Sequence, residues 1–92
     1  MHRFRIDAIP DPQSLPRIAG FFAQRAMIPS AMRMRMLRRQ MRVEVTVDGL
    51  DAVQAAIIAA KLGEMFAVIE VELVAPENIR HSGDGRNLSL AA

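Results

Sequence analysis

Residues 31–47, AMRMRMLRRQMRVEVTV, decide the fold, because apolar residues recur at every second position on both sides of a short polar break. Methionine alternates with arginine over Ala31–Met36, and valine alternates with charged or polar residues over Met41–Val47. A period of two is typical of half-buried strands. The polar residues at 38–40 suit a short hairpin connection, although no glycine or asparagine specifies the turn. The stretch predicts two antiparallel strands whose methionines and valines face the core.

A helix is expected on each side of this hairpin. Residues 14–27 have apolar side chains at helical spacing, with Ser14 as the expected N-cap, and Pro29 disfavours helix at the preceding residue. After the hairpin, Asp48 can cap a helix that ends near Gly63, with Asp51 in its first turn. The residues expected to face the core are Leu15, Ile18, Ala19, Phe22 and Ala26 in the first helix, and Val53, Ala56, Ile57 and Ala60 in the second.

Two further alternating stretches, residues 2–9 and 67–73, predict the first and last strands. The order is then βαββαβ. Right-handed crossovers arrange it as a ferredoxin-like α+β fold, a four-stranded antiparallel sheet with both helices on one face. The strands lie in the spatial order fourth, first, third, second. Residues 1–75 form this domain, and the polar, glycine-containing residues 76–92 are expected to be a flexible C-terminal tail.

Eleven of the twelve basic residues are arginines, and five of them fall between residues 33 and 42. Such a cluster could bind nucleic acid or an acidic protein surface. In the predicted strand order, however, Glu70 and Glu72 lie beside Arg3 and Arg5 on the open face of the sheet, and Glu44 lies beside the arginines of the second strand. Nucleic-acid binding is therefore not favoured, and the lack of Tyr and Trp removes base stacking.

The composition excludes most catalytic and metal chemistry. No cysteine is present, which removes disulfides, thiolate catalysis and cysteine-based metal sites. His2 and His81 have no partner at metal-ligand spacing, and no nucleophile elbow or phosphate-binding glycine loop occurs. No apolar run approaches the roughly 20 residues of a membrane span. We expect a cytoplasmic, non-enzymatic protein without a cofactor, a metal or a membrane partner.

Several apolar residues fall outside the predicted core and indicate contact with a partner. Phe21 lies close to Arg17 and Gln24 on the first helix, and Ile58 and Leu62 lie away from the expected core stripe of the second. The second strand is a sheet edge without an interior proline, so a second chain could add strands there.

Residues 11–25, DPQSLPRIAGFFAQR, resemble the first loop and helix of an ACT domain, and more narrowly those of the small regulatory subunits of acetohydroxyacid (acetolactate) synthase. The likeness continues in VEVTV at residues 43–47 and in KLGEMFAV at residues 61–68. It runs in register from Phe4 to Leu73, and it is closest to the short, single-domain members of that family.

This resemblance implies a subunit with no active site of its own. Such a subunit binds and activates the large, thiamine-diphosphate-dependent catalytic subunit in branched-chain amino-acid biosynthesis. The positions expected to contact that partner are Arg17, Phe21, Gln24, Arg25, Arg33 and Arg35.

The resemblance also implies a homodimer through the second strand, with an amino-acid effector held at the interface. The corresponding positions are Asp11, Gln13, Ser14, Ile28, Pro29 and Ser30. Valine-responsive members have Asn, Gly and Asn where this chain has Pro10, Gln13 and Ile28, so weak or no inhibition by valine is expected. A freestanding amino-acid sensor and a basic accessory protein that binds nucleic acid remain the alternatives.

Overall fold

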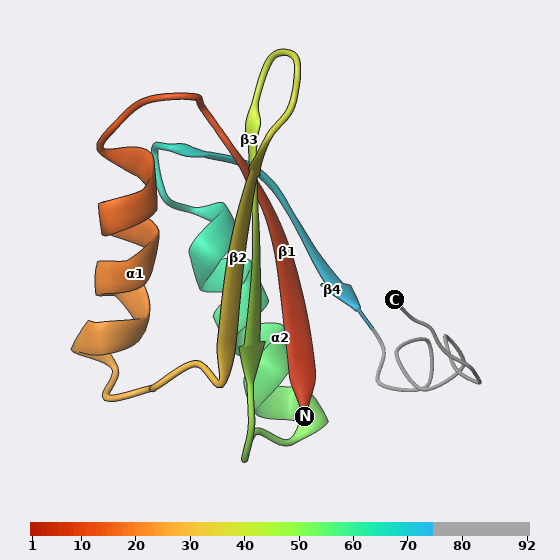
Figure 1. Cartoon of the computed structure of the whole chain (residues 1–92). Coiled ribbons are helices and arrows are strands. Elements are labelled where there is room, and N and C mark those ends of the chain that lie inside the picture. Colours follow the sequence, from red (N-terminus) through yellow and green to blue (C-terminus); the bar gives the residue numbers. More distant parts are fainter. Residues whose placement is uncertain (75–92) are drawn as a thin grey trace.

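The computed structural model describes residues 1–74, which form a four-stranded sheet with both helices on one face (Figure 1). All neighbouring strands are antiparallel, in the order β2-β3-β1-β4, so the predicted topology is confirmed. The predicted tail at residues 76–92 lies outside the described residues. The elements are β1 His2–Ala8, α1 Ser14–Gln24, β2 Ala31–Met36, β3 Met41–Val47, α2 Ala52–Gly63 and β4 Val68–Val74.

The core lies between the two central strands and the helices. Phe4 of β1 stands opposite Val45 of β3, and both are fully buried. The ring of Phe22 from α1 packs on Phe4 with 5.9 Å between centroids, and Ile18 adds a second buried side chain one turn earlier. The apolar residues of the alternating pattern in β1 and β3 are therefore buried, since these strands have neighbours on both sides.

The ends of α1 differ from the prediction. The N-cap is Gln13, and the hydroxyl of the fully buried Ser14 instead donates to the carbonyl of Ile9 at 2.8 Å, across the turn that enters the helix. The helix stops at Gln24 rather than near Met27, because the chain turns left-handed at Ala26, with a φ of 57°. The N–H groups of Ala26 and Met27 then donate to the carbonyls of Ala23 and Phe22, which is a Schellman ending.

The helix α2 is rotated relative to the prediction. Its N-cap is Asp51 rather than Asp48, and Asp51 and Gln54 form a reciprocal capping box. Leu62 is fully buried, whereas Val53 and Ile57 are 69% and 50% exposed. The helix has apolar residues around most of its circumference, so a second stripe at helical spacing was available. The stripe that faces the core is Ala55, Ile58, Ala59 and Leu62.

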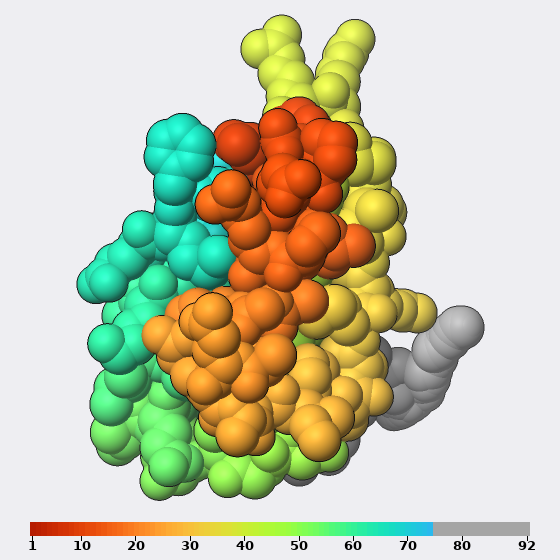
Figure 2. All heavy atoms as spheres, turned by 90° about the vertical axis from the view of Figure 1, so that its left-hand side faces the viewer, coloured from red at the N-terminus to blue at the C-terminus, as the bar shows by residue number. Residues whose placement is uncertain are grey.

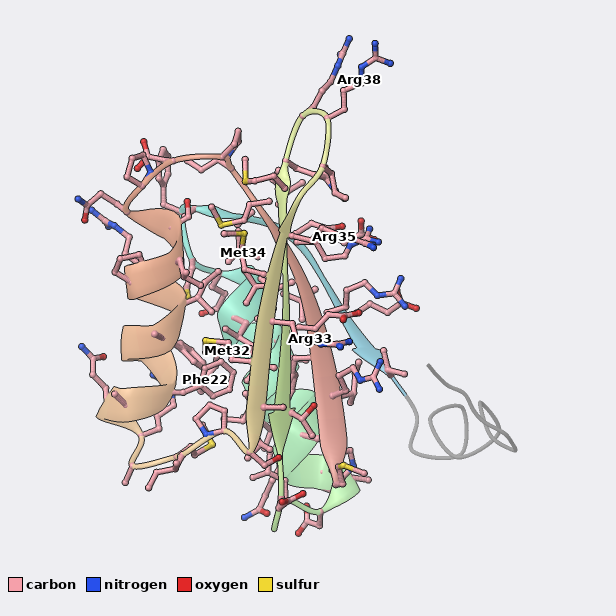
Figure 3. The ribbon with its side chains drawn as sticks, in the orientation of Figure 1. Phe22, Met32, Arg33, Met34, Arg35 and Arg38 are labelled. Carbon is pink, nitrogen blue, oxygen red and sulfur yellow. The ribbon has the colours of Figure 1, made fainter. Side chains whose placement is uncertain are left out.

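The methionines of β2 were predicted to be core residues, and this prediction is wrong. Met32 and Met34 extend from the helix side of the sheet, as expected (Figure 3). They remain 38% and 46% exposed, and Met36 is 55% exposed, because β2 is an edge strand and no residue of it is buried. The apolar face of β2 is therefore an uncovered surface.

A register shift in the other edge strand also changes a predicted face. Asp7 stands opposite Glu70, but the next residue of β1, Ala8, stands opposite Val68. Ile69 is the residue skipped, and it is 54% exposed although the alternation had placed it in the core.

Candidate functional site

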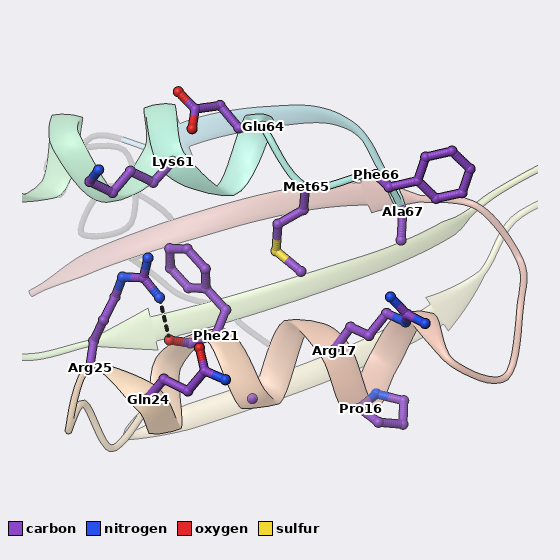
Figure 4. Close-up of a pocket in the computed structure, with 11 residues that line it drawn as sticks. Pro16, Arg17, Phe21, Gln24, Arg25, Lys61, Glu64, Met65, Phe66 and Ala67 are labelled. Atoms are coloured by element: carbon purple, nitrogen blue, oxygen red, sulfur yellow. Dashed lines mark hydrogen bonds between the residues drawn. The ribbon is translucent and has the colours of Figure 1, made fainter.

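A groove of about 620 Å³ runs between the two helices. The space-filling view from the helix side shows α1 (orange) in front and the end of α2 with the segment after it (turquoise) beside it (Figure 2). One wall is formed by α1 and the other by the last turn of α2 and residues 64–67 (Figure 4). Four predicted partner contacts line this groove together: Arg17, Phe21, Gln24 and Arg25.

Phe21 forms part of the floor of the groove. The sequence had placed it outside the core, but it is only 5% exposed and packs edge-on against Phe22, with 5.3 Å between ring centroids. The guanidinium of Arg25 lies over the Phe21 ring at 3.8 Å and donates to the Phe21 carbonyl at 3.1 Å. This bond uses one of the five N–H donors of the guanidinium. Arg25 is thereby held at the wall of the groove.

The groove combines an apolar floor with a mostly basic lining. Arg17, Arg25 and Lys61 contribute three positive charges, and Glu64 contributes one negative charge. Phe66 lies on the opposite wall from α1 and is 92% exposed, the largest exposure among the large apolar residues of the described chain. This arrangement suits a segment of another protein that carries both apolar and acidic side chains.

The candidate effector residues form two separate groups. Asp11, Gln13 and Ser14 line a depression of about 220 Å³ at the N-terminal end of α1, where the Asp11 carboxylate accepts from the Gln13 N–H at 2.8 Å. Ile28, Pro29 and Ser30 follow the opposite end of that helix. Eleven residues of helix separate the groups by about 16 Å at 1.5 Å per residue. One copy of the chain therefore does not bring both groups into one site.

Arg33 and Arg35 lie on the open face of the sheet, on the opposite side from the groove (Figure 3). These two predicted contacts therefore do not share a surface with the four that line the groove.

Two ion pairs form among the charges on the open face of the described residues. The guanidinium of Arg5 bonds to the carboxylate of Glu72 at 3.2 Å, as the strand order predicted. Glu70 stands opposite Asp7 rather than beside Arg3, because Arg3 is opposite Val74. The sequence reasoning missed a fork-like pair in which Arg42 donates to both oxygens of Asp7, at 2.9 and 3.3 Å. These hydrogen bonds raise the pKa of Arg42 above its ordinary value.

Within residues 1–74, no group of three His, Asp or Glu side chains is arranged to hold a metal ion. Neither of the two helices described is long and apolar enough to cross a membrane.

Comparisons with known proteins agree on the fold. The structure is similar to the ACT domain from GTP pyrophosphokinase of Chlorobium tepidum, with a TM-score of 0.68, 12% identity, and coverage of 79% of this chain and 95% of that one. It is also similar to the C-terminal domain of the MgtC protein from Mycobacterium tuberculosis, with a TM-score of 0.59, 16% identity, and coverage of 83% and 86%. No curated protein matches the sequence. A family model described as an ACT-like domain matches residues 1–80, and the chain belongs to that family.

Proposed function

We propose that this chain is a non-catalytic regulatory subunit that binds and activates the large catalytic subunit of acetolactate synthase through the groove between α1 and α2. ACT domains are in general regulatory and carry no catalytic residues, which supports the coarser part of the proposal. The choice of enzyme rests on the sequence resemblance at residues 11–25 and 61–68.

One observation carries the choice of surface. All eleven residues that line the groove belong to the two resembling segments, six to residues 11–25 and five to residues 61–68. These segments are far apart in the sequence, and the fold places them face to face. A docking site that spans both of them accounts for the presence of both motifs in one small chain.

The chemistry of the groove defines the expected partner segment. Met65 and the exposed Phe66 offer apolar surface in the groove, and Arg17, Arg25 and Lys61 line it with positive charge. A segment with an apolar anchor flanked by Asp or Glu would bury the anchor and pair its carboxylates at the rim.

The experiment mixes the purified large catalytic subunit with this chain and measures acetolactate formation and co-elution. Binding and a rise in turnover are expected. Gly20 lines the groove, and a Cβ added there meets no atom within 4 Å, so Gly20→Leu should obstruct the groove while the fold stays intact. Gly20→Ala is the matched control and should bind like the wild type. If the wild type neither co-elutes nor raises turnover, the proposal fails.

A freestanding amino-acid sensor is the second candidate, and the depression beside Asp11 favours it. Asp11 and Arg17 line the same depression, so a carboxylate and a guanidinium are available for the ammonium and carboxylate groups of an amino acid. Calorimetric titration with the common amino acids tests this role. Binding heat that disappears in Asp11→Asn would support it, and flat titrations would remove it.

A further inference from the structure

Among the residues that the structure describes, the sheet has two edge strands of opposite charge. In the described part of the chain, β2 and β4 each have a strand neighbour on one side only. The open face of β2 carries Arg33 and Arg35, and the same face of β4 carries Glu70 and Glu72. Both strands have apolar side chains on the helix side. Edge strands with unpaired backbone groups are templates for pairing with another chain.

The charges form rows across the sheet that end with opposite signs. One row contains Glu72, Arg5, Glu44 and Arg33, from β4 through β1 and β3 to β2, so the sign alternates at every step. A next copy placed beside β2 with its own β4 would continue that alternation. The second row, from Glu70 on β4 to Arg35 on β2, likewise begins with an acid and ends with a base.

In β2, the backbone N–H and C=O groups that do not bond to β3 belong to the methionines. The Leu37 N–H donates to the carbonyl of Gln40 at 2.8 Å, so Leu37 turns its polar groups toward β3. Successive residues of an antiparallel strand turn these groups to opposite sides. Arg33 and Arg35 therefore also face β3, and Met32 and Met34 direct N–H and C=O to the free edge. The Ser30 N–H, just before β2 begins, departs from this alternation and donates to the carbonyl of Thr46.

The same reasoning applies to β4. The Ile9 N–H donates to the carbonyl of Ala67 at 2.9 Å, so every second residue back along β1 also faces β4. The partners of these residues in β4 include Glu70 and Glu72, which thus face inward to β1. Val71 and Leu73 direct their backbone groups to the free edge.

One register between β2 of one copy and β4 of the next pairs the free backbone groups and the opposite charges, and it keeps the apolar side chains on one face. With Met34 opposite Val71 and Met32 opposite Leu73 of the next copy, the free backbone groups meet each other. The same register sets Arg33 opposite Glu72 and Arg35 opposite Glu70, on the open face. Since β2 and β4 run antiparallel within one copy, the next copy needs only to be shifted sideways, with its helices on the same side.

The resemblance predicted pairing of β2 with β2, but in such a pair like charges would stand opposite one another. A two-fold arrangement that matches the free backbone groups sets Met34 against Met34 and Arg33 against Arg35, or Arg33 against Arg33. Like charges directly opposite one another are unfavourable. Within its own chain Arg35 already stands opposite Arg42, whereas Glu70 stands opposite Asp7, so each of these two residues lacks an opposite charge directly across.

We propose that copies of this chain associate head to tail, with β2 of one copy pairing with β4 of the next. Such a contact is heterologous, because two different surfaces meet. It therefore extends beyond a dimer or closes as a ring.

The test is sedimentation equilibrium of the full chain alone over a range of concentrations. The wild type is expected to form species larger than a dimer. The double charge reversal Glu70→Arg/Glu72→Arg should weaken association roughly tenfold or more, because two attractive pairs become repulsive. Arg33→Glu/Arg35→Glu should do the same. An equimolar mixture of the two reversed chains should associate again, because every β2–β4 contact between one variant and the other is complementary.

A monomeric wild type would overturn the proposal, and so would a dimer that survives Glu70→Arg/Glu72→Arg, as pairing through β2 would. Circular dichroism checks that each variant is folded. Met34→Pro should disrupt the β2–β4 contact without a change of charge. The N–H that it removes faces the free edge, so the hydrogen bonds between β2 and β3 are kept. Association that persists in Met34→Pro also contradicts the proposal. These measurements use the chain without any enzyme, so they stand apart from the test of its function.

Discussion

Shortening Leu62 and Ile57 to alanine, one at a time, compares two side chains of equal carbon count on the same helix. Leu62 is fully buried on the core-facing side of α2, and Ile57 is half exposed on the outer side of the same helix. Leu62→Ala removes about three carbon groups at about 0.8 kcal/mol each. The cavity left behind raises the loss in unfolding free energy to about 3 kcal/mol. For Ile57→Ala about half the transfer term applies and no closed cavity forms, so the loss is about 1 kcal/mol.

Urea unfolding followed by circular dichroism measures both values. With a slope near 1 kcal/mol per M for a domain of this size, the midpoint should fall by about 3 M for Leu62→Ala and by about 1 M for Ile57→Ala. A small domain could lose most of its stability in the first variant, so Leu62→Met is the milder companion and should cost less than about 1.5 kcal/mol. An equal loss for both alanine variants, or a larger loss for Ile57→Ala, would refute the orientation of α2.

Three further changes test local features of the fold. Ala26→Gly should raise the unfolding free energy by about 1 kcal/mol in a thermal melt, because Ala26 holds a left-handed φ that glycine adopts without strain; a lower melting temperature would contradict the Schellman ending. Asp51→Ala should lower the unfolding free energy by about 1 kcal/mol in urea, since the capping box is lost, and Asp48→Ala is the control that should change little. Asp7→Asn and Arg42→Met should each destabilise the fold, and their combination should cost less than the sum in a double-mutant cycle; strict additivity would show that the pair contributes nothing.

The sheet could be predicted from the sequence because the alternation of apolar and polar residues is a strong signal for strands. A period of two separates faces unambiguously, and the central strands β1 and β3 have neighbours on both sides that bury their apolar face. The same signal in β2 gave the direction of the methionines but not their burial. Burial depends on what covers an edge strand, and the alternation of residues contains no information about that.

The orientation of α2 could not be predicted because the helix is apolar on both sides. Ile57 and Ile58 are adjacent, and each belongs to a complete stripe at helical spacing. The choice between the stripes depends on where the helix begins. Both Asp48 and Asp51 are good caps, and Gln54, three residues after Asp51, was the available signal for a capping box.

One wall of the groove could be inferred from the sequence, and the other could not. Arg17, Phe21, Gln24 and Arg25 recur at helical spacing in the sequence, and the structure places all four at the groove, while their contact with a partner stays a prediction. Phe21 was placed outside the core because the buried stripe of α1 is wider than the one inferred. The opposite wall could not be found from spacing, because residues 61–67 reach α1 only through the fold. Only the resemblance indicated that both segments matter.

Amide hydrogen exchange tests the groove as the docking surface most directly. It compares the free chain with the chain saturated by the large catalytic subunit of acetolactate synthase. Slower exchange is expected at residues 17–25 and 61–67, with little change in the hairpin at residues 37–40. A complex in which residues 17–25 and 61–67 exchange as fast as in the free chain would contradict the docking of the partner in this groove.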